Sequence, residues 1–136
     1  MKNIVKIRKQ GKFYVAYDDD GYVIHAIMDY KVSNGKIGFP ESSIGKVTNA
    51  LEEHKINYQI LEDKKEVFKK IFPKNKYRQY YLNGKKTYDR ILKSNDLIEK
   101  IKNLSSEQLS QLIKYIEEIW LRIMINLKLL VKLKNL

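Results

Sequence analysis

The C-terminal third of the chain contains the feature that most constrains the fold, a long segment that is apolar on nearly every side. Apolar residues between Leu109 and Leu133 are spaced by three, four and seven, the heptad pattern of a coiled coil, with Asn126 at one core position. A helix that is apolar on most faces has to be buried, and a small sheet domain offers too little surface to cover it. We therefore expect a homo-oligomer or partner-helix interface within residues 109–136, formed by Ile116, Ile119, Trp120, Ile123, Leu127 and Leu130.

Two other places for this helix remain open: it packs within its own chain, or it lies on a membrane surface. The second fits less well, because the cations Arg122, Lys128, Lys132 and Lys134 do not gather on one face. No membrane span is predicted, since the longest unbroken apolar run after Arg122 is three residues. The first six residues alternate apolar and basic side chains, unlike a signal peptide, so we expect a cytoplasmic protein.

Charge divides the chain into two parts near residue 62. The formal net charge is +11. Residues 1–62 contain nine Lys and Arg against eight Asp and Glu, whereas residues 63–136 contain eighteen against eight. We therefore expect a nearly neutral β/α unit over 1–62 and a basic helical extension over 63–136 that ends in the long apolar helix.

Most of the excess charge lies between residues 64 and 93, where cations alternate with Phe and Tyr. Lysines that neutralise phosphates and tyrosines that stack on unpaired bases favour a nucleic-acid surface. An acidic protein partner, or a solvated face above a core of Tyr77, Tyr81 and Tyr88, remains open as well. The candidate nucleic-acid-binding residues here are Lys64, Lys65, Lys69, Lys70, Lys74, Lys76, Arg78, Lys85, Lys86 and Arg90.

The first 62 residues alternate between the two-residue period of strands and the longer period of helices. The order is β-β-α-β-α-β, which predicts an α/β (α+β mixed) fold, a small mixed sheet with two packed helices. Acidic residues 18–20 are expected to cap the first helix, and Pro40 to begin the second. The expected strands are residues 4–7, 13–17, 31–39 and 57–61, and the expected helices are 19–30 and about 40–54.

Beyond residue 63 the spacing of apolar residues predicts helices throughout. Val67, Phe68, Ile71 and Phe72 form a short stripe that Pro73 ends. The pair at 83–84, Asn-Gly, is a break signal that would divide the following segment into two helices. A cap at residue 94 or 95 would begin a further helix, and Ser105 with Gln108 forms a capping box at the start of the long helix, which ends near residue 134.

No set of residues predicts catalysis or a bound cofactor. The chain has no cysteine and two histidines, which excludes a disulfide framework and a thiolate zinc site. Asp18, Asp19 and Asp20 lack the ligand spacing of a calcium loop, and no phosphate-binding glycine loop or catalytic triad is present. We therefore expect no enzyme activity, no metal and no cofactor.

A family resemblance covers about residues 9–61. It is carried by Gly11-Lys12-Phe13-Tyr14, Asp19-Asp20-Gly21-Tyr22, Gly35-Lys36-Ile37-Gly38-Phe39-Pro40 and the segment from Lys46 to Tyr58. This stretch resembles the N-terminal mismatch-recognition domain of MutS, in particular its small stand-alone bacterial relatives. The resemblance implies DNA contact by Phe13 and Tyr14, with Phe13 stacking on a mispaired base. The Glu that follows in the family motif is replaced by Val15, which cannot accept a hydrogen bond, so we expect weakly specific binding.

Whether Phe13 is exposed or belongs to the core remains open at this stage, and so do two functions. The first is a non-enzymatic nucleic-acid-binding module, with DNA favoured over RNA. The second is a phage- or mobile-element-encoded adaptor or inhibitor of a nucleic-acid-handling protein, for example an anti-CRISPR, that assembles through the C-terminal helix.

Overall fold

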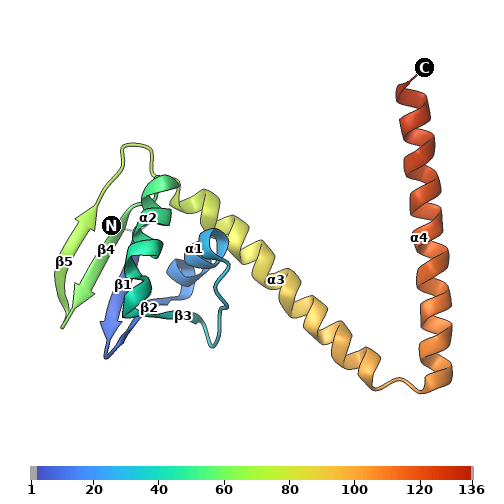
Figure 1. Cartoon of the computed structure of the whole chain (residues 1–136), viewed down its shortest axis with the longest axis horizontal. Coiled ribbons are helices and arrows are strands. Elements are labelled where there is room, and N and C mark those ends of the chain that lie inside the picture. Colours follow the sequence, from blue (N-terminus) through green and yellow to red (C-terminus); the bar gives the residue numbers. More distant parts are fainter. Residues whose placement is uncertain (1–2, 136) are drawn as a thin grey trace. The chain divides into compact units, whose positions relative to one another are not determined.

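A five-stranded mixed sheet with β1 (Val5–Gln10) at its centre organises the computed structural model, which describes residues 3–135 (Figure 1). The strand order is β3-β2-β1-β4-β5. β1 pairs antiparallel with β2 (Phe13–Tyr17) and parallel with β4 (Tyr58–Glu62), and β3 (Lys36–Pro40) is antiparallel to β2. The expected mixed α+β fold and the element order through β4 are therefore confirmed.

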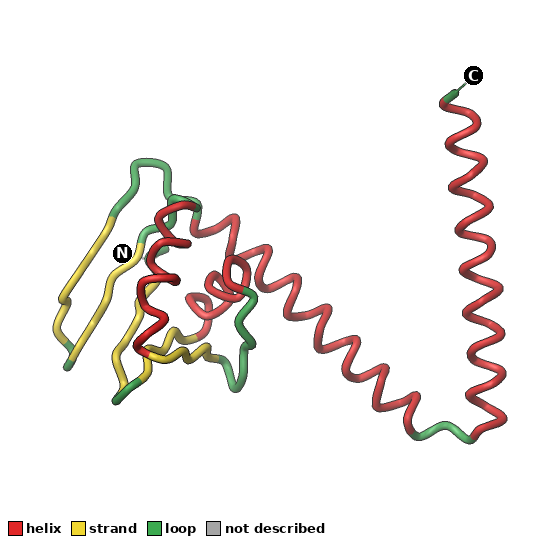
Figure 2. The backbone as a smooth tube through the Cα atoms, in the orientation of Figure 1, coloured by secondary structure: helices red, strands yellow, loops and turns green. Residues whose placement is uncertain are grey.

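The core lies between one face of this sheet and two helices, α1 (Asp18–Met28) and α2 (Ile44–Glu53) (Figure 2). Side chains alternate along β1 and β3, so that Val5, Ile7, Ile37 and Phe39 are buried while their neighbours are exposed. The same alternation leaves the opposite face of the sheet uncovered by the other elements of residues 3–92.

The starts of both helices differ in detail from the expectation. Tyr17 is the N-cap of α1 and makes no side-chain cap hydrogen bond, so Asp18, Asp19 and Asp20 occupy the first turn instead of capping it. Their carboxylates are still favourable there, because the helix N-terminus carries partial positive charge. Pro40 ends β3 and precedes a short 3-10 turn, η1 (Glu41–Ser43), which leads into α2.

The helix expected from Val67 to Phe72 is wrong, because Lys65–Lys70 forms β5. β5 pairs antiparallel with β4 across a two-residue turn, with Glu62 opposite Lys65. Both turn residues, Asp63 and Lys64, have positive φ, as a type I′ hairpin turn requires. The turn returns the chain along β4, and the apolar residues then pack as strand residues.

Two compact units divide the chain, one ending at Leu92 and the other beginning at Lys93, so the boundary expected at residue 62 falls inside the first unit. The physical reason is that β5 belongs to the sheet and that the first part of α3 (Tyr77–Lys102) packs on the core. Tyr77 is buried, and Tyr80, Tyr81 and Tyr88 pack against the core cluster, so these tyrosines serve as core residues.

α3 is one continuous helix, so the breaks expected at residues 83–84 and 94–95 are wrong. Gly84 is buried within α3, where it faces the backbone of Tyr22 in α1. Glycine is needed there because a Cβ would lie 1.9 Å from the Tyr22 carbonyl oxygen. The glycine that resembled a helix break is thus a site of close approach between two helices.

α4 (Ser106–Lys134) begins at the expected capping box. The Ser105 side chain accepts a hydrogen bond from the Gln108 amide at 3.1 Å, and the Gln108 side chain accepts one from the Ser105 amide at 3.0 Å. Across the described residues, none of the helices combines the length and the apolar character that crossing a membrane demands.

The contact at Gly84 generates a stability prediction. Gly84→Ala should lower the free energy of unfolding by about 1–3 kcal/mol, since the added methyl group forces α3 away from α1. That loss should exceed the gain of ~1 kcal/mol that alanine brings to a helix interior. Urea denaturation measures the difference. Asn83→Ala, at the exposed neighbouring position, is the control and should be neutral or stabilising; an equally stable Gly84→Ala variant would contradict the packing of α3 on α1.

Candidate nucleic-acid interface

The ten cations expected to form one nucleic-acid surface are divided by the fold. Lys64, Lys65, Lys69 and Lys70 lie at the β4–β5 turn and along the edge strand, Lys74 and Lys76 lie in the segment that follows, and Arg78, Lys85, Lys86 and Arg90 lie on α3. Figure 1 shows β5 and the first part of α3 on opposite sides of the sheet-containing unit. A contiguous basic stretch in the sequence therefore becomes two separate basic regions.

Two of the ten cations are already occupied by other contacts. Lys70 pairs with Glu52 of α2 at 3.1 Å. Lys85 pairs with Asp89 at 3.3 Å, and its ammonium lies 4.9 Å from the centre of the Tyr22 ring. Asp89 raises the pKa of Lys85, and Lys70 lowers the pKa of Glu52. The other eight cations form no ion pair within residues 3–135.

A different set of cations shares the uncovered face of the sheet. Lys6 and Arg8 lie on either side of the buried Ile7 on β1, and Lys36 lies on β3. Register places Lys69 of β5 on the same face, because Gln59 is the partner of both Lys6 and Lys69. All four are exposed, and none has an ion-pair partner within the described residues 3–135.

Two exposed aromatic rings lie among these cations on β2. Phe13 is 53% exposed and Tyr17 is 38% exposed. Their strand neighbours are Gln10 and Lys36, respectively, on the uncovered face. The side-chain amide of Gln10 donates a hydrogen bond to the Tyr17 hydroxyl, which fixes that ring over the sheet. Aromatic rings surrounded by free cations on an open sheet can stack on bases while the cations contact phosphates.

The two motif residues point in opposite directions. Phe13 lies on the uncovered face, so its alternative placement in the core is wrong. Tyr14 is buried against Phe39, with ring centres 6.0 Å apart, and its hydroxyl donates to Glu62 at 3.1 Å. Burial, with that acceptor, raises the pKa of the Tyr14 hydroxyl. Tyr14 therefore stabilises the core and cannot stack on a base.

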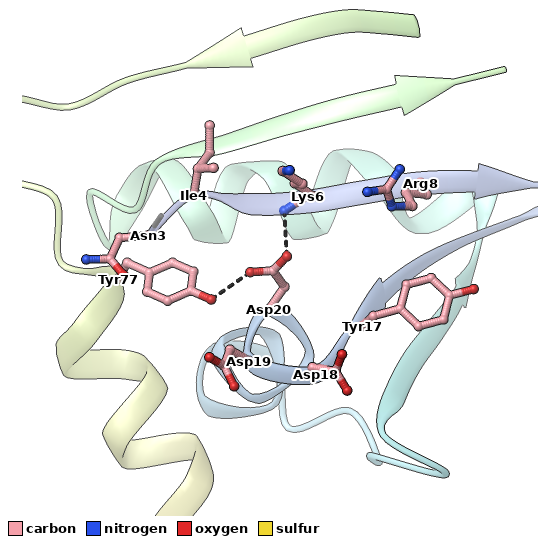
Figure 3. Close-up of a pocket in the computed structure, with 9 residues that line it drawn as sticks. All are labelled: Asn3, Ile4, Lys6, Arg8, Tyr17, Asp18, Asp19, Asp20 and Tyr77. Carbon is pink, nitrogen blue, oxygen red and sulfur yellow. Dashed lines mark hydrogen bonds between the residues drawn. The ribbon is translucent and has the colours of Figure 1, made fainter. Parts of the chain in front are cut away.

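A cavity of about 620 Å³ opens beside β1, between the strand and the start of α1 (Figure 3). Lys6 and Arg8 line one side, and Asp18 and Asp19 line the other. These two exposed carboxylates repel phosphate, so the basic face ends where Asp18 and Asp19 begin. Within residues 3–135, no group of three or more His, Asp or Glu side chains is arranged to hold a metal ion.

Asp20, at the base of this cavity, connects three elements. Its carboxylate accepts hydrogen bonds from the Lys6 backbone amide at 3.1 Å and from the Tyr77 hydroxyl at 2.6 Å (Figure 3). Burial raises the pKa of Asp20, although both hydrogen bonds favour its charged form. Burial and Asp20 together raise the pKa of the Tyr77 hydroxyl. These bonds tie α3 and α1 to the central strand and hold the cavity in shape.

Sequence patterns identified only part of this face. Phe13 and Lys69 were among the predicted residues, whereas Lys6, Arg8, Tyr17 and Lys36 were not. The available signal was the two-residue alternation of cations with Val5 and Ile7, which marks one solvated side of a strand. The six residues predicted as a protein interface all lie on α4 and are exposed within their own unit.

No protein-family model matches this sequence, and no curated protein is significantly similar to it.

The hydrogen bond between Tyr77 and Asp20 generates a second prediction. Tyr77→Phe should lower the free energy of unfolding by about 1–3 kcal/mol, because a partly buried carboxylate loses one of its two donors. Thermal and urea denaturation measure the loss. Tyr80→Phe, three residues further along α3, is the control. The Tyr80 hydroxyl forms no hydrogen bond within residues 3–135, so its removal should cost less stability. Equal stability of the two variants would contradict a role for Asp20 in holding α3.

Proposed function

We propose that this protein is a non-enzymatic, cytoplasmic DNA-binding module that uses the uncovered face of its sheet. The observation that carries the proposal is the pair of exposed rings on β2, Phe13 and Tyr17, among the free cations of β1, β3 and β5. The preferred ligand is DNA with unpaired bases, because a ring can stack only on a base whose face is accessible.

The geometry suits a strand of DNA that crosses the sheet. Phe13 and Tyr17 are four residues apart on one side of β2, which corresponds to about 13 Å. Lys6 and Arg8 flank the rings on one side and Lys36 on the other. Stacking supplies sequence-tolerant affinity, and the cations supply the salt-dependent part.

The resemblance to the MutS mismatch-recognition domain supports the same face. The position of the stacking Phe corresponds to Phe13, which is exposed. The position of the base-reading Glu corresponds to Val15, whose apolar side chain offers no hydrogen bond. We therefore propose that binding tolerates different bases at the stacking positions instead of selecting a mispair.

One observation favours a second candidate, an adaptor or inhibitor of a nucleic-acid-handling protein such as a CRISPR effector. The apolar residues of α4 are exposed within their unit, and such a surface is typical of a protein interface. In that case the helix, and not the sheet face, would carry the activity. Variants of the sheet face distinguish the two candidates.

Removal of either exposed ring tests the proposal. Phe13→Ala and Tyr17→Ala should each weaken binding to a fluorescent single-stranded oligonucleotide by about 1–3 kcal/mol, measured by anisotropy at low salt. Phe68→Ala is the matched control, because Phe68 is also exposed but lies on the other side of the sheet, against Tyr58. If all three variants bind equally well, the uncovered face does not stack on bases.

The salt dependence of binding tests the cations. Each phosphate contact contributes about −0.7 to the slope of log affinity against log salt for single strands, so Arg8→Ala should make the slope less steep by about 0.7. Lys86→Ala, on α3, should leave the slope unchanged. The reverse result, an effect of Lys86 and none of Arg8, would assign the phosphate contacts to the helix.

A further inference from the structure

α4 presents a continuous apolar face that its own unit does not cover. Seven apolar residues and Asn126 follow one another at alternating spacings of three and four along this face: Leu109, Leu112, Ile116, Ile119, Ile123, Asn126, Leu130 and Leu133. Six of these eight residues are exposed, Leu133 to 66%. The helix has 29 residues and is therefore about 43 Å long. An isolated helix of this kind is unstable in water unless its apolar face is buried.

The charges of α4 are separated along its length. Glu107, Glu117 and Glu118 all precede Trp120, with Lys114 as the single cation among them. Arg122, Lys128, Lys132 and Lys134 all follow Trp120, and no acidic residue lies among them. The first half of the helix is thus net negative, and the second half is strongly positive.

This separation of charge favours a second copy of α4, running in the opposite direction, as the occupant of the apolar face. A second copy of α4 in the opposite direction places its basic half beside the acidic half of the first. A parallel pair instead places the four cations of one helix beside the same four of the other, and like charges at neighbouring positions destabilise a helix pair. A reversed copy of α4 thus matches both the charges and the apolar face of α4, so a second copy of this chain can cover that face without another protein.

We propose that α4 pairs with α4 of a second copy in an antiparallel arrangement. The heptad positions permit this register, because their spacings read the same in both directions. Leu109 then lies level with Leu133 of the second copy, and Ile119 lies level with Ile123 of the second copy. Glu118 lies within two residues of the level of Arg122 of the second copy. The pairing is independent of the proposed DNA binding.

The mass of the full chain in solution is the first test. Analytical ultracentrifugation at micromolar concentrations should give a dimer of the 16.2 kDa chain. Ile123→Glu, in the centre of the apolar face, should convert it into a monomer. Leu121→Glu is the matched control, because Leu121 is exposed on the opposite side of the helix, and it should remain dimeric. A monomeric unsubstituted chain, or dissociation by both variants alike, would overturn the proposal.

The direction of the two helices is tested by disulfide cross-linking, which is simple here because the chain has no cysteine. A mixture of the Leu109→Cys and Leu133→Cys variants should form a mixed disulfide under mild oxidation. Leu109→Cys alone should form none, since its two copies lie about 36 Å apart in the antiparallel register. A disulfide between two copies of Leu109→Cys would establish a parallel pair and overturn the assignment.

Salt gives an independent readout of the same charges. Attraction between opposite halves should weaken as salt is raised, so the dimer dissociation constant should increase several-fold between low and high salt. Glu117→Lys combined with Glu118→Lys should mimic that increase, and Glu53→Lys on α2 is the control. A dimer that tightens with salt would indicate like charges at the interface and would contradict the antiparallel direction.

Discussion

The parallel pairing of β1 with β4 is the contact on which the rest of the sheet-containing unit depends. It joins Val5 to Tyr58 and Ile7 to Ile60, two segments that are far apart in the chain. Parallel strands need a crossover, so the chain between them leaves the sheet and returns through α1, β3 and α2. Both helices lie on one face as a result, and the other face is left to the cations and rings that we propose bind DNA.

The packing of α3 on this framework decides where the C-terminal cations lie. The Tyr22 carbonyl against Gly84 and the Tyr77 hydroxyl bonded to Asp20 fix which side of α3 faces the core. The tyrosines of α3 then supply core surface, and its cations other than Lys85 are exposed. Because β5 lies at the far edge of the sheet, the basic stretch of the sequence cannot act as one surface.

Much of the fold could be predicted from local patterns. The early strands and helices follow from apolar periodicity, and α4 follows from the capping box at Ser105 and the heptads. The residues of β5 predict a helix because a short apolar run such as Val67–Phe68 fits either period, and only the pairing of β5 with β4 resolves the choice. Gly84 resembles a helix break in the sequence because its partner in the fold, Tyr22, is distant along the chain.

By itself, the sequence determined the positive charge, the lack of cysteine, the two-residue alternation along β1 and the long apolar helix α4. These properties depend on residue type and on spacing within one element. Only the tertiary structure decided that Arg8, Lys36 and Lys69 share a face with Phe13, while Tyr14 belongs to the core. The reason is that strand register joins residues from distant segments, and no local pattern contains that register.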